Sequence, residues 1–299
     1  MAKAPRSLAG KVVAITGGAR GIGRATAAAL IAQGARVAIG DIEADLAVQT
    51  AAELGSGTVG LYLDVTDRAS FKTFLDETED KLGPLYALIN NAGIMPIGPF
   101  IEESDRTAQR MIEINLNGVI YGSKLALERF VPRNRGHLVN VSSVAGKFGA
   151  PGGATYSATK HAVVGLSEAI RNELRGTDID VSIVMPVGVN TELYSGLPQP
   201  RGLKIAEPED VANGIVEALQ TGRVDVYVPK RLQALIRGTY MVPRPVADLI
   251  AKVLKADQAL INPDHALRGA YEVRTGDSTP QTPSPAPAPE ESPREKQTV

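Results

Sequence analysis

The sequence KVVAITGGARGIG, residues 11–23, decides the fold of this chain. Its first six residues are mostly apolar and β-branched, as expected for a strand that is buried on both faces. The glycines that follow allow a tight turn, and the pattern of residues 24–33 predicts a helix. This order brings backbone N–H groups to a helix N-terminus, where they can bind a pyrophosphate. A plain glycine turn is the alternative, but it does not require strand, loop and helix in this order.

The second predicted strand, residues 35–40, leads into Asp41, which lies 18 residues after Gly23. An acid about 20 residues after the glycine loop accepts hydrogen bonds from the adenosine ribose of a dinucleotide. A carboxylate there repels a 2′-phosphate, so Asp41 favours NAD over NADP. Arg20 argues weakly for NADP, because a cation in the loop can bind the phosphate. We give Asp41 more weight, because an unpaired carboxylate that faces a phosphate costs more than a flexible arginine gains.

Short apolar runs continue to alternate with helical patterns along the chain. Further strands are predicted at 58–63, 85–90, 137–141, 180–185 and 225–228, and helices at 44–54, 67–82, 104–131, 154–174 and 208–221. This alternation predicts an α/β fold with a parallel sheet and helices on both faces. Ligands then bind beyond the carboxyl ends of the strands. Six residues that can carry chemistry fall at those ends: Gly17, Asp41, Asp64, Asn91, Ser143 and Pro186.

Tyr156 and Lys160 are four residues apart in the predicted helix 154–174, so they lie on one face, one turn apart. Tyrosine titrates near pH ~10 in water and is a poor proton carrier at neutral pH. A nearby ammonium group favours the phenolate and lowers its pKa. The pair is therefore a candidate general acid/base unit.

Composition excludes several classes of function. The chain has 299 residues, a formal net charge of -1 and no cysteine, so it has no disulfide, no thiol nucleophile and no Cys-based metal site. Its three histidines lack metal-ligand spacing, and no metal site is expected. The charge does not favour nucleic acid. The sequence shows neither a secretory signal at its N-terminus nor an apolar run long enough to span a bilayer, so we expect a cytoplasmic protein.

The C-terminal quarter of the sequence differs from the rest in its charge and in its hydrophobic pattern. Residues 230–255 hold six basic residues and one acid, and Val246, Leu249, Ile250, Val253 and Leu254 form one helical face. This segment is either a helix packed on the domain or a basic amphipathic helix at a membrane surface or partner. We expect a catalytic domain at 1–229 and a C-terminal helical extension at 230–275. The Pro-rich tail 276–299 is expected to be disordered.

Together these motifs resemble the classical short-chain dehydrogenase/reductase (SDR) family over residues 8–228. The motifs are the glycine loop, Asn90-Asn91-Ala92-Gly93, Asn115, Ser143, and Tyr156 with Lys160. Ser143 and Tyr156 are 13 residues apart, as in that family. The resemblance implies a single-domain, doubly wound (Rossmann) sheet of seven strands.

The resemblance also implies a catalytic tetrad of Asn115, Ser143, Tyr156 and Lys160. Tyr156 would exchange the proton of the substrate hydroxyl. Lys160 would bind the nicotinamide ribose and, with the positive ring of the cofactor, lower the pKa of Tyr156. Ser143 would hydrogen-bond the substrate oxygen. Asn115 would hold a water that links Lys160 to solvent.

The cofactor-binding residues that the resemblance implies span three loops. The glycine loop would contribute Gly17, Arg20, Gly21, Ile22 and Gly23. Asp64 and Val65 would contact adenine, Asn91, Ala92 and Gly93 would line the adenosine side, and Val189 and Thr191 would bind the carboxamide. The chain departs from the family after the sixth strand, where the usual Pro-Gly is Pro186-Val187 and the glycine follows at Gly188.

The expected function is that of an NAD-dependent oxidoreductase that interconverts a secondary alcohol and a ketone by direct hydride transfer. Apolar residues in 94–100 and 192–203, with cover from residues 230–255, suggest a lipophilic substrate that is steroid-, retinoid- or long-chain-like. The alternatives are an NADPH-dependent carbonyl reductase and, from another class, a non-catalytic dinucleotide sensor or scaffold. We expect a homodimer through helices 104–131 and 154–174, since the extension could block the second interface of a homotetramer. Light scattering that shows a stable tetramer would refute the dimer.

Overall fold

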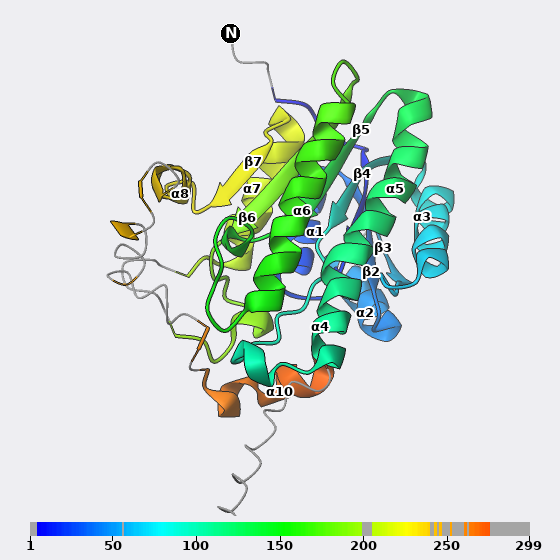
Figure 1. The fold of residues 1–299 in the computed structure, drawn as a ribbon. Helices are drawn as coiled ribbons and strands as arrows, with labels where there is room; N and C mark the ends of the chain where they lie inside the picture. The colour runs from blue at the N-terminus through cyan, green and yellow to red at the C-terminus, as the bar shows by residue number, and fades with distance from the viewer. Residues whose placement is uncertain are drawn as a thin grey trace, which may run out of the picture.

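The computed structural model describes residues 5–55, 57–198, 205–239, 242–243, 245–246, 252, 260–261 and 263–275. Seven parallel strands form one sheet in the order β3-β2-β1-β4-β5-β6-β7 (Figure 1). The strands are β1 (Val12–Thr16), β2 (Arg36–Asp41), β3 (Thr58–Tyr62), β4 (Leu85–Asn90), β5 (Gly136–Val141), β6 (Ile179–Pro186) and β7 (Asp225–Val228). The predicted seven-stranded parallel sheet is confirmed.

Helices connect the strands, and side chains at their ends fix several of the boundaries. They are α1 (Gly21–Ala32), α2 (Ala44–Leu54), α3 (Arg68–Leu82), α4 (Asp105–Ile112), α5 (Gly118–Phe130), α6 (Ala154–Glu173), α7 (Pro208–Thr221), α8 (Leu232–Thr239) and α10 (His265–Thr275). Asp67 caps α3 by accepting from the Ala69 N–H, and Ser104 caps α4 by accepting from the Thr107 N–H. Glu207 and Asp210 form a capping box at the start of α7.

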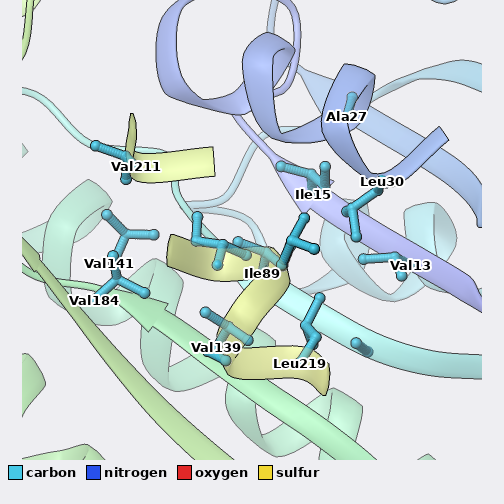
Figure 2. Close-up of a cluster of buried hydrophobic side chains, with 14 of the residues drawn as sticks. Val13, Ile15, Ala27, Leu30, Ile89, Val139, Val141, Val184, Val211 and Leu219 are labelled. Carbon is cyan, nitrogen blue, oxygen red and sulfur yellow. The ribbon is translucent and has the colours of Figure 1, made fainter. Parts of the chain in front are cut away.

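The sheet separates two hydrophobic cores. In β1, Val13 and Ile15 face one core, while Val12 and Ala14 face the other, as the alternation of side chains along a strand requires. Helices α1 and α7 cover the first core, which Figure 2 shows with Ala27, Leu30, Val211 and Leu219 around the sheet residues. Helices α3, α5 and α6 cover the second core. The layers therefore follow the doubly wound pattern that the sequence predicts.

The strand order reverses between β1 and β4, and this reversal opens a crevice at their carboxyl ends. The Thr16 hydroxyl at the end of β1 accepts from the N–H groups of Asn91 and Ala92, at 3.0 and 2.9 Å. These bonds hold the glycine loop after β1 against the loop after β4. The two loops that were predicted to bind a dinucleotide are thus fixed side by side.

The predicted uninterrupted helix 104–131 is wrong in its middle. Between α4 and α5 the backbone forms a π-helix over Glu113–Asn117, with Asn115 at its centre. A π-helix holds an extra residue per turn, which changes the direction of a side chain relative to an α-helix and is found mostly at functional sites. The hydrophobic pattern of a sequence does not show such a local change, because the residues on either side remain helical.

The C-terminal extension packs on the domain where the structure describes it. In α8, Leu232 and Ile236 are buried against Tyr227 of β7. Of the predicted apolar face, Leu249, Ile250, Val253 and Leu254 lie outside the described residues, as does the tail 276–299. Across the described helices, none is long and apolar enough to cross a membrane. The small residues Ala154, Ala158 and Gly165 on α6 are exposed, as the predicted helix pairing in a dimer requires. The dimer itself stays a prediction.

Helix α2 lies so close to β3 that only glycine fits at position 60. A Cβ at Gly60 would lie 2.1 Å from the Ala47 carbonyl oxygen and 2.5 Å from the Val48 nitrogen. We predict that Gly60→Ala lowers the free energy of unfolding by about 1–3 kcal/mol, because backbone must move to admit the methyl group. Urea denaturation measures this change. Gly149→Ala is the control, since a Cβ there meets no described atom within 4 Å. Equal stability of Gly60→Ala and the unsubstituted chain would contradict the close contact.

Candidate active site

The glycine loop leaves its backbone uncovered at the start of α1. Gly17 has a φ of +63°, and a Cβ at Gly23 would lie 2.2 Å from the Gly17 carbonyl oxygen. Side chains are therefore excluded from both positions, and the N–H groups at the start of α1 remain accessible to a phosphate group. Ile22 turns away from the loop and packs against the core beneath α1. The residues present fit the pyrophosphate of a dinucleotide.

Asn91 braces this loop from the end of β4. Its side-chain Nδ2 donates to the carbonyl oxygens of Thr16 and Gly17, at 2.9 and 3.1 Å. A Cβ at Gly17 would lie 3.0 Å from the Ala92 Cα, so the two loops touch through their backbones. The side-chain amide of Asn91 thus positions the loop; the contact of Asn91, Ala92 and Gly93 with adenosine stays a prediction.

Asp41 ends β2 beside the glycine loop, as expected of the ribose-binding acid. Its Oδ2 accepts from the Ala19 N–H and its Oδ1 from the Glu43 N–H, both at 3.3 Å. Arg20 faces acids: its guanidinium lies 2.6 Å from Glu43 and 3.6 Å from Glu192. Both ion pairs lie at the surface, with the Arg20 side chain 31% exposed.

Asp64 and Val65, predicted to contact adenine, are both occupied within the fold. The Asp64 Oδ1 accepts from the backbone N–H and the hydroxyl of Thr66, at 2.9 and 2.7 Å, which closes a local turn. The Val65 side chain is buried against Gly118 of α5, where a Cβ would lie 3.0 Å from it. A contact between these residues and adenine must then involve the backbone or the exposed part of Asp64.

The loop after β6 returns to the glycine loop. A Cβ at Gly21 would lie 3.3 Å from the Thr191 methyl group, so Thr191 borders the predicted pyrophosphate site. Val189 is buried and pairs with Ala206 in an isolated bridge. The shifted glycine has a packing reason, because a Cβ at Gly188 would lie 2.5 Å from the ring of Tyr194. Of the two predicted carboxamide-binding residues, Thr191 therefore stands beside the glycine loop, while Val189 packs in the core.

Lys160 is buried at the crevice, with only 5% of its surface exposed. Its Nζ donates to the Val141 carbonyl oxygen at the end of β5, at 3.1 Å, and lies 5.6 Å from the centroid of the Tyr156 ring. A Cβ at Gly93 would lie 3.5 Å from this Nζ, so Lys160 also reaches the loop after β4. Burial lowers the pKa of Lys160 to about 8, because the charged form loses its hydration.

Polar residues that carry no predicted role hold α6 in place. The Ser142 hydroxyl donates to the Lys160 carbonyl oxygen at 2.9 Å. Asn140 donates to the Ser167 hydroxyl at 2.9 Å and accepts from Asn90 at 2.8 Å. These buried bonds link β4, β5 and α6, and so fix the positions of Lys160 and Tyr156 relative to the carboxyl ends of the strands. Ser142, Asn140 and Ser167 were not predicted from the sequence, because their only sign there is a polar residue within an otherwise apolar segment.

Tyr156 is 7% exposed and lies within an apolar cluster. Burial raises the pKa of its phenol, the nearby Ser143 hydroxyl lowers it, and the nearby phenol of Tyr271 raises it further. Burial is the largest of these effects. Ser143 follows β5; its hydroxyl accepts from the Ala145 N–H at 3.1 Å and donates to the Pro186 carbonyl oxygen at 3.4 Å. The structure thus brings Ser143, Tyr156 and Lys160 together.

Asn115 is fully buried in the π-helix and faces the loop after β4. Its side-chain Oδ1 accepts from the Ile94 N–H and its Nδ2 donates to the Ile94 carbonyl oxygen, both at 2.8 Å. Nδ2 also lies 3.4 Å from the Thr159 hydroxyl. The side-chain amide therefore positions the loop after β4. A water held by Asn115 would have to bind its backbone.

Apolar side chains surround the Tyr156 ring. Met95, Met111, Ala150 and Leu260 share its buried cluster, and Ile94, Ile97, Leu193, Tyr194 and Leu197 pack against it. Parts of the predicted walls 94–100 and 192–203 thus stand beside Tyr156, whereas Phe100 is 71% exposed and lies outside this cluster. Residues 199–203 lie outside the described residues. Leu260, Arg268 and Tyr271, which cover this cluster, were not predicted from the sequence. No motif marks them, and cover was expected from 230–255.

Comparison with known proteins identifies related enzymes. The chain is 36% identical over 220 residues to the 2,5-dichloro-2,5-cyclohexadiene-1,4-diol dehydrogenase LinX of Sphingobium indicum, which covers 69% of this chain and 88% of that protein. It is 35% identical over 213 residues to the 3-alpha-(or 20-beta)-hydroxysteroid dehydrogenase of Mycobacterium tuberculosis, which covers 70% and 82%. A solved short chain dehydrogenase/reductase from Burkholderia phymatum in complex with NAD matches with a TM-score of 0.71 and 27% identity, covering 78% of this chain and 93% of that chain.

The family model of the short chain dehydrogenases matches residues 11–201. This range includes every predicted cofactor-binding and catalytic residue, from Gly17 to Thr191. Helices α8 and α10 lie beyond it. The chain therefore belongs to the short chain dehydrogenase family of oxidoreductases, which act on CH–OH groups with a nicotinamide dinucleotide cofactor.

Proposed function

We propose that the protein is an NAD-dependent oxidoreductase that interconverts a lipophilic secondary alcohol and its ketone by direct hydride transfer. The observation that carries this proposal is the meeting of Ser143, Tyr156 and Lys160 beside a glycine loop that side chains leave open. When bound, the cofactor supplies the hydride acceptor and, in its oxidised form, a positive charge. The protein supplies orientation, exclusion of water and the path of the proton.

Tyr156 is the general base in oxidation and the general acid in reduction. The Ser143 hydroxyl lies close enough to Tyr156 to lower the pKa of its phenol, and it would donate to the substrate oxygen in place of its 3.4 Å bond to the Pro186 carbonyl oxygen. Lys160 reaches both Tyr156 and the loop after β4, where it would bind the nicotinamide ribose. Burial is the largest effect on the pKa of Tyr156, and it raises that pKa. The phenolate therefore depends on positive charge at the site, from the Lys160 ammonium and the oxidised cofactor together.

The preference for NAD rests on charge around the glycine loop. Asp41 points its carboxylate at the Ala19 N–H, where it can accept from ribose hydroxyls and repel a 2′-phosphate. Arg20, which could favour NADP, is paired with Glu43 and Glu192. These contacts argue against the NADPH-dependent carbonyl reductase that is the main alternative.

The lipophilic substrate is supported by the cluster around Tyr156, in which Met95, Met111, Ala150 and Leu260 are buried. The similar proteins named above include a hydroxysteroid dehydrogenase and a cyclohexadiene diol dehydrogenase, both of which act on ring alcohols by name. We infer a ring-shaped or otherwise bulky secondary alcohol. The test is NAD reduction across secondary alcohols of increasing size, repeated with NADP. Cofactor binding without turnover of any alcohol would favour the non-catalytic sensor instead.

Replacement of the phenol hydroxyl tests the acid/base role. We predict that Tyr156→Phe lowers kcat by about 10²–10⁴-fold, the usual contribution of general acid/base catalysis. The Kd for NADH, measured by fluorescence titration, is expected to stay nearly unchanged, because the ring still fills its place. Tyr121→Phe on α5 is the matched control and is expected to retain turnover. Near-normal turnover by Tyr156→Phe would make the assignment wrong.

Removal of the Asp41 carboxylate tests cofactor selection. We predict that Asp41→Ala shifts the ratio of kcat/KM for NADP over NAD upward by at least about tenfold, which corresponds to ~1.4 kcal/mol. The reason is that the repulsion of a 2′-phosphate and the hydrogen bonds to the ribose are lost together. Asp45→Ala, on the exposed first turn of α2, is the control. An unchanged ratio in Asp41→Ala would mean that another group decides selectivity.

A further inference from the structure

The chain beyond the family match returns to the apolar cluster around Tyr156. Figure 1 shows α10 at the end of the molecule where α4 and α6 begin. We call the described residues 260–261 and 263–275 the cap. The Asp264 N–H donates to the Gly196 carbonyl oxygen at 2.7 Å, and the Leu267 carbonyl oxygen accepts from the Ser195 hydroxyl at 3.2 Å. The cap is therefore bound to the loop that follows β6.

Leu260 joins the cap to the other side of the pocket. A Cβ at Gly153 would lie 2.8 Å from the Leu260 side chain and 3.8 Å from the Tyr156 Cβ. A Cβ at Gly152 would lie 2.4 Å from the Leu260 carbonyl oxygen. Because the two residues before α6 are glycines, Leu260 of the cap can pack next to Tyr156, the candidate general base. Leu260 itself belongs to the apolar cluster of Tyr156.

Arg268 links both walls of the pocket to the cap. Its side chain is 0% exposed. Its guanidinium donates to the Met95 carbonyl oxygen at 2.5 Å, and to the carbonyl oxygens of Leu193 and Ser195 at 3.0 and 3.2 Å. Met95 lies in the wall after β4, while Leu193 and Ser195 lie in the wall after β6. One buried side chain therefore holds two loops that have no sequence connection near the site.

The charge of Arg268 is only partly compensated. Its Nε lies 3.4 Å from the Glu272 carboxylate, and burial lowers the pKa of the guanidinium. It also contacts uncharged groups, three carbonyl oxygens and the Tyr271 ring. A buried charge with such partners gains less than one in a bidentate ion pair, because desolvation offsets much of the attraction. This arrangement can fix the walls and still release them.

Tyr271 is the aromatic side chain of the cap. Its hydroxyl accepts from the Met95 N–H at 2.7 Å, and its ring centroid lies 4.8 Å from the Arg268 guanidinium carbon. Tyr271 and Arg268 thus take both hydrogen-bonding groups of the Met95 backbone. Tyr271 also lies near enough to Tyr156 that its charge would affect that phenol. It therefore borders the space in which a substrate must meet Tyr156.

We propose that this cap completes the substrate site, that Tyr271 limits the size of the alcohol that reaches Tyr156, and that Arg268 is the positioning residue that holds the cap on both walls. The proposal rests on the proposed function, because it concerns the substrate of that reaction. It adds a specificity-determining residue from a part of the chain outside the family match.

The first measurement needs no substrate. Met95 is buried beneath the cap, so its oxidation by hydrogen peroxide, followed by peptide mass spectrometry, reports how often the cap opens. We expect Arg268→Met to oxidise at Met95 at least about tenfold faster than the unsubstituted chain, a factor that corresponds to ~1.4 kcal/mol. Arg268→Lys, which keeps the charge, is expected to recover part of the protection. Met185 in the core of β6 reports global unfolding. Equal Met95 rates at an unchanged Met185 rate would overturn the role of Arg268.

The second measurement concerns selectivity. The ratio of kcat/KM for a hydroxysteroid over cyclohexanol, with NAD, is expected to rise at least about tenfold in Tyr271→Ala, because removal of the ring enlarges the pocket. Leu267→Ala, on the exposed side of the same helix at 65% exposure, is expected to leave the ratio unchanged. An unchanged ratio in Tyr271→Ala would overturn the role of Tyr271. If the unsubstituted chain binds NADH but oxidises neither alcohol, the proposed function fails, while the Met95 rates still decide whether Arg268 holds the cap.

Discussion

The arrangement of the site depends on one buried contact, the hydrogen bond from the Lys160 ammonium group to the Val141 carbonyl oxygen. This contact places a cation beside the Tyr156 ring, at the carboxyl end of β5. An ammonium group so far from water needs a rigid frame, because an unpaired buried charge is costly. The bonds from Ser142 to the Lys160 carbonyl oxygen and from Asn140 to Ser167 provide that frame. They join α6 to the sheet through contacts within the protein itself.

Burial changes the two partners in opposite directions. It lowers the pKa of Lys160 to about 8 and raises that of Tyr156, so the pocket disfavours charge on both groups. The cap, with Leu260 and Tyr271, helps to exclude water from these two groups. Under the proposed function, such a site would keep the phenol neutral until positive charge arrives with the cofactor. Proton transfer would then be coupled to cofactor binding, as a reaction in which hydride and proton leave the same alcohol requires.

The sequence predicts the frame of this site better than its details. The sheet and the residues at its carboxyl ends follow from short apolar runs, because a parallel sheet must place its loops at one edge. The π-helix around Asn115 and the pairing of Arg20 with Glu43 and Glu192 depend on local backbone and tertiary contacts that no pattern records. The cap was harder still. Arg268 and Tyr271 reach Met95 across more than 170 residues, and a helix of the extension carries no sign of where it docks.

The titration of Lys160 tests the central claim most directly. Its pKa is about 8 in the folded chain against 10.5 for an ordinary lysine, so between these values the unfolded chain binds more protons and the free energy of unfolding rises with pH. Lys160→Met has no group at this position that titrates, so this rise is absent from it. We predict that the unfolding free energy of Lys160→Met minus that of the unsubstituted chain falls by about 1 kcal/mol per pH unit between pH ~8 and ~9.5, below the range in which tyrosines of the unfolded chain titrate. A difference that does not change with pH would contradict a buried, destabilised ammonium group.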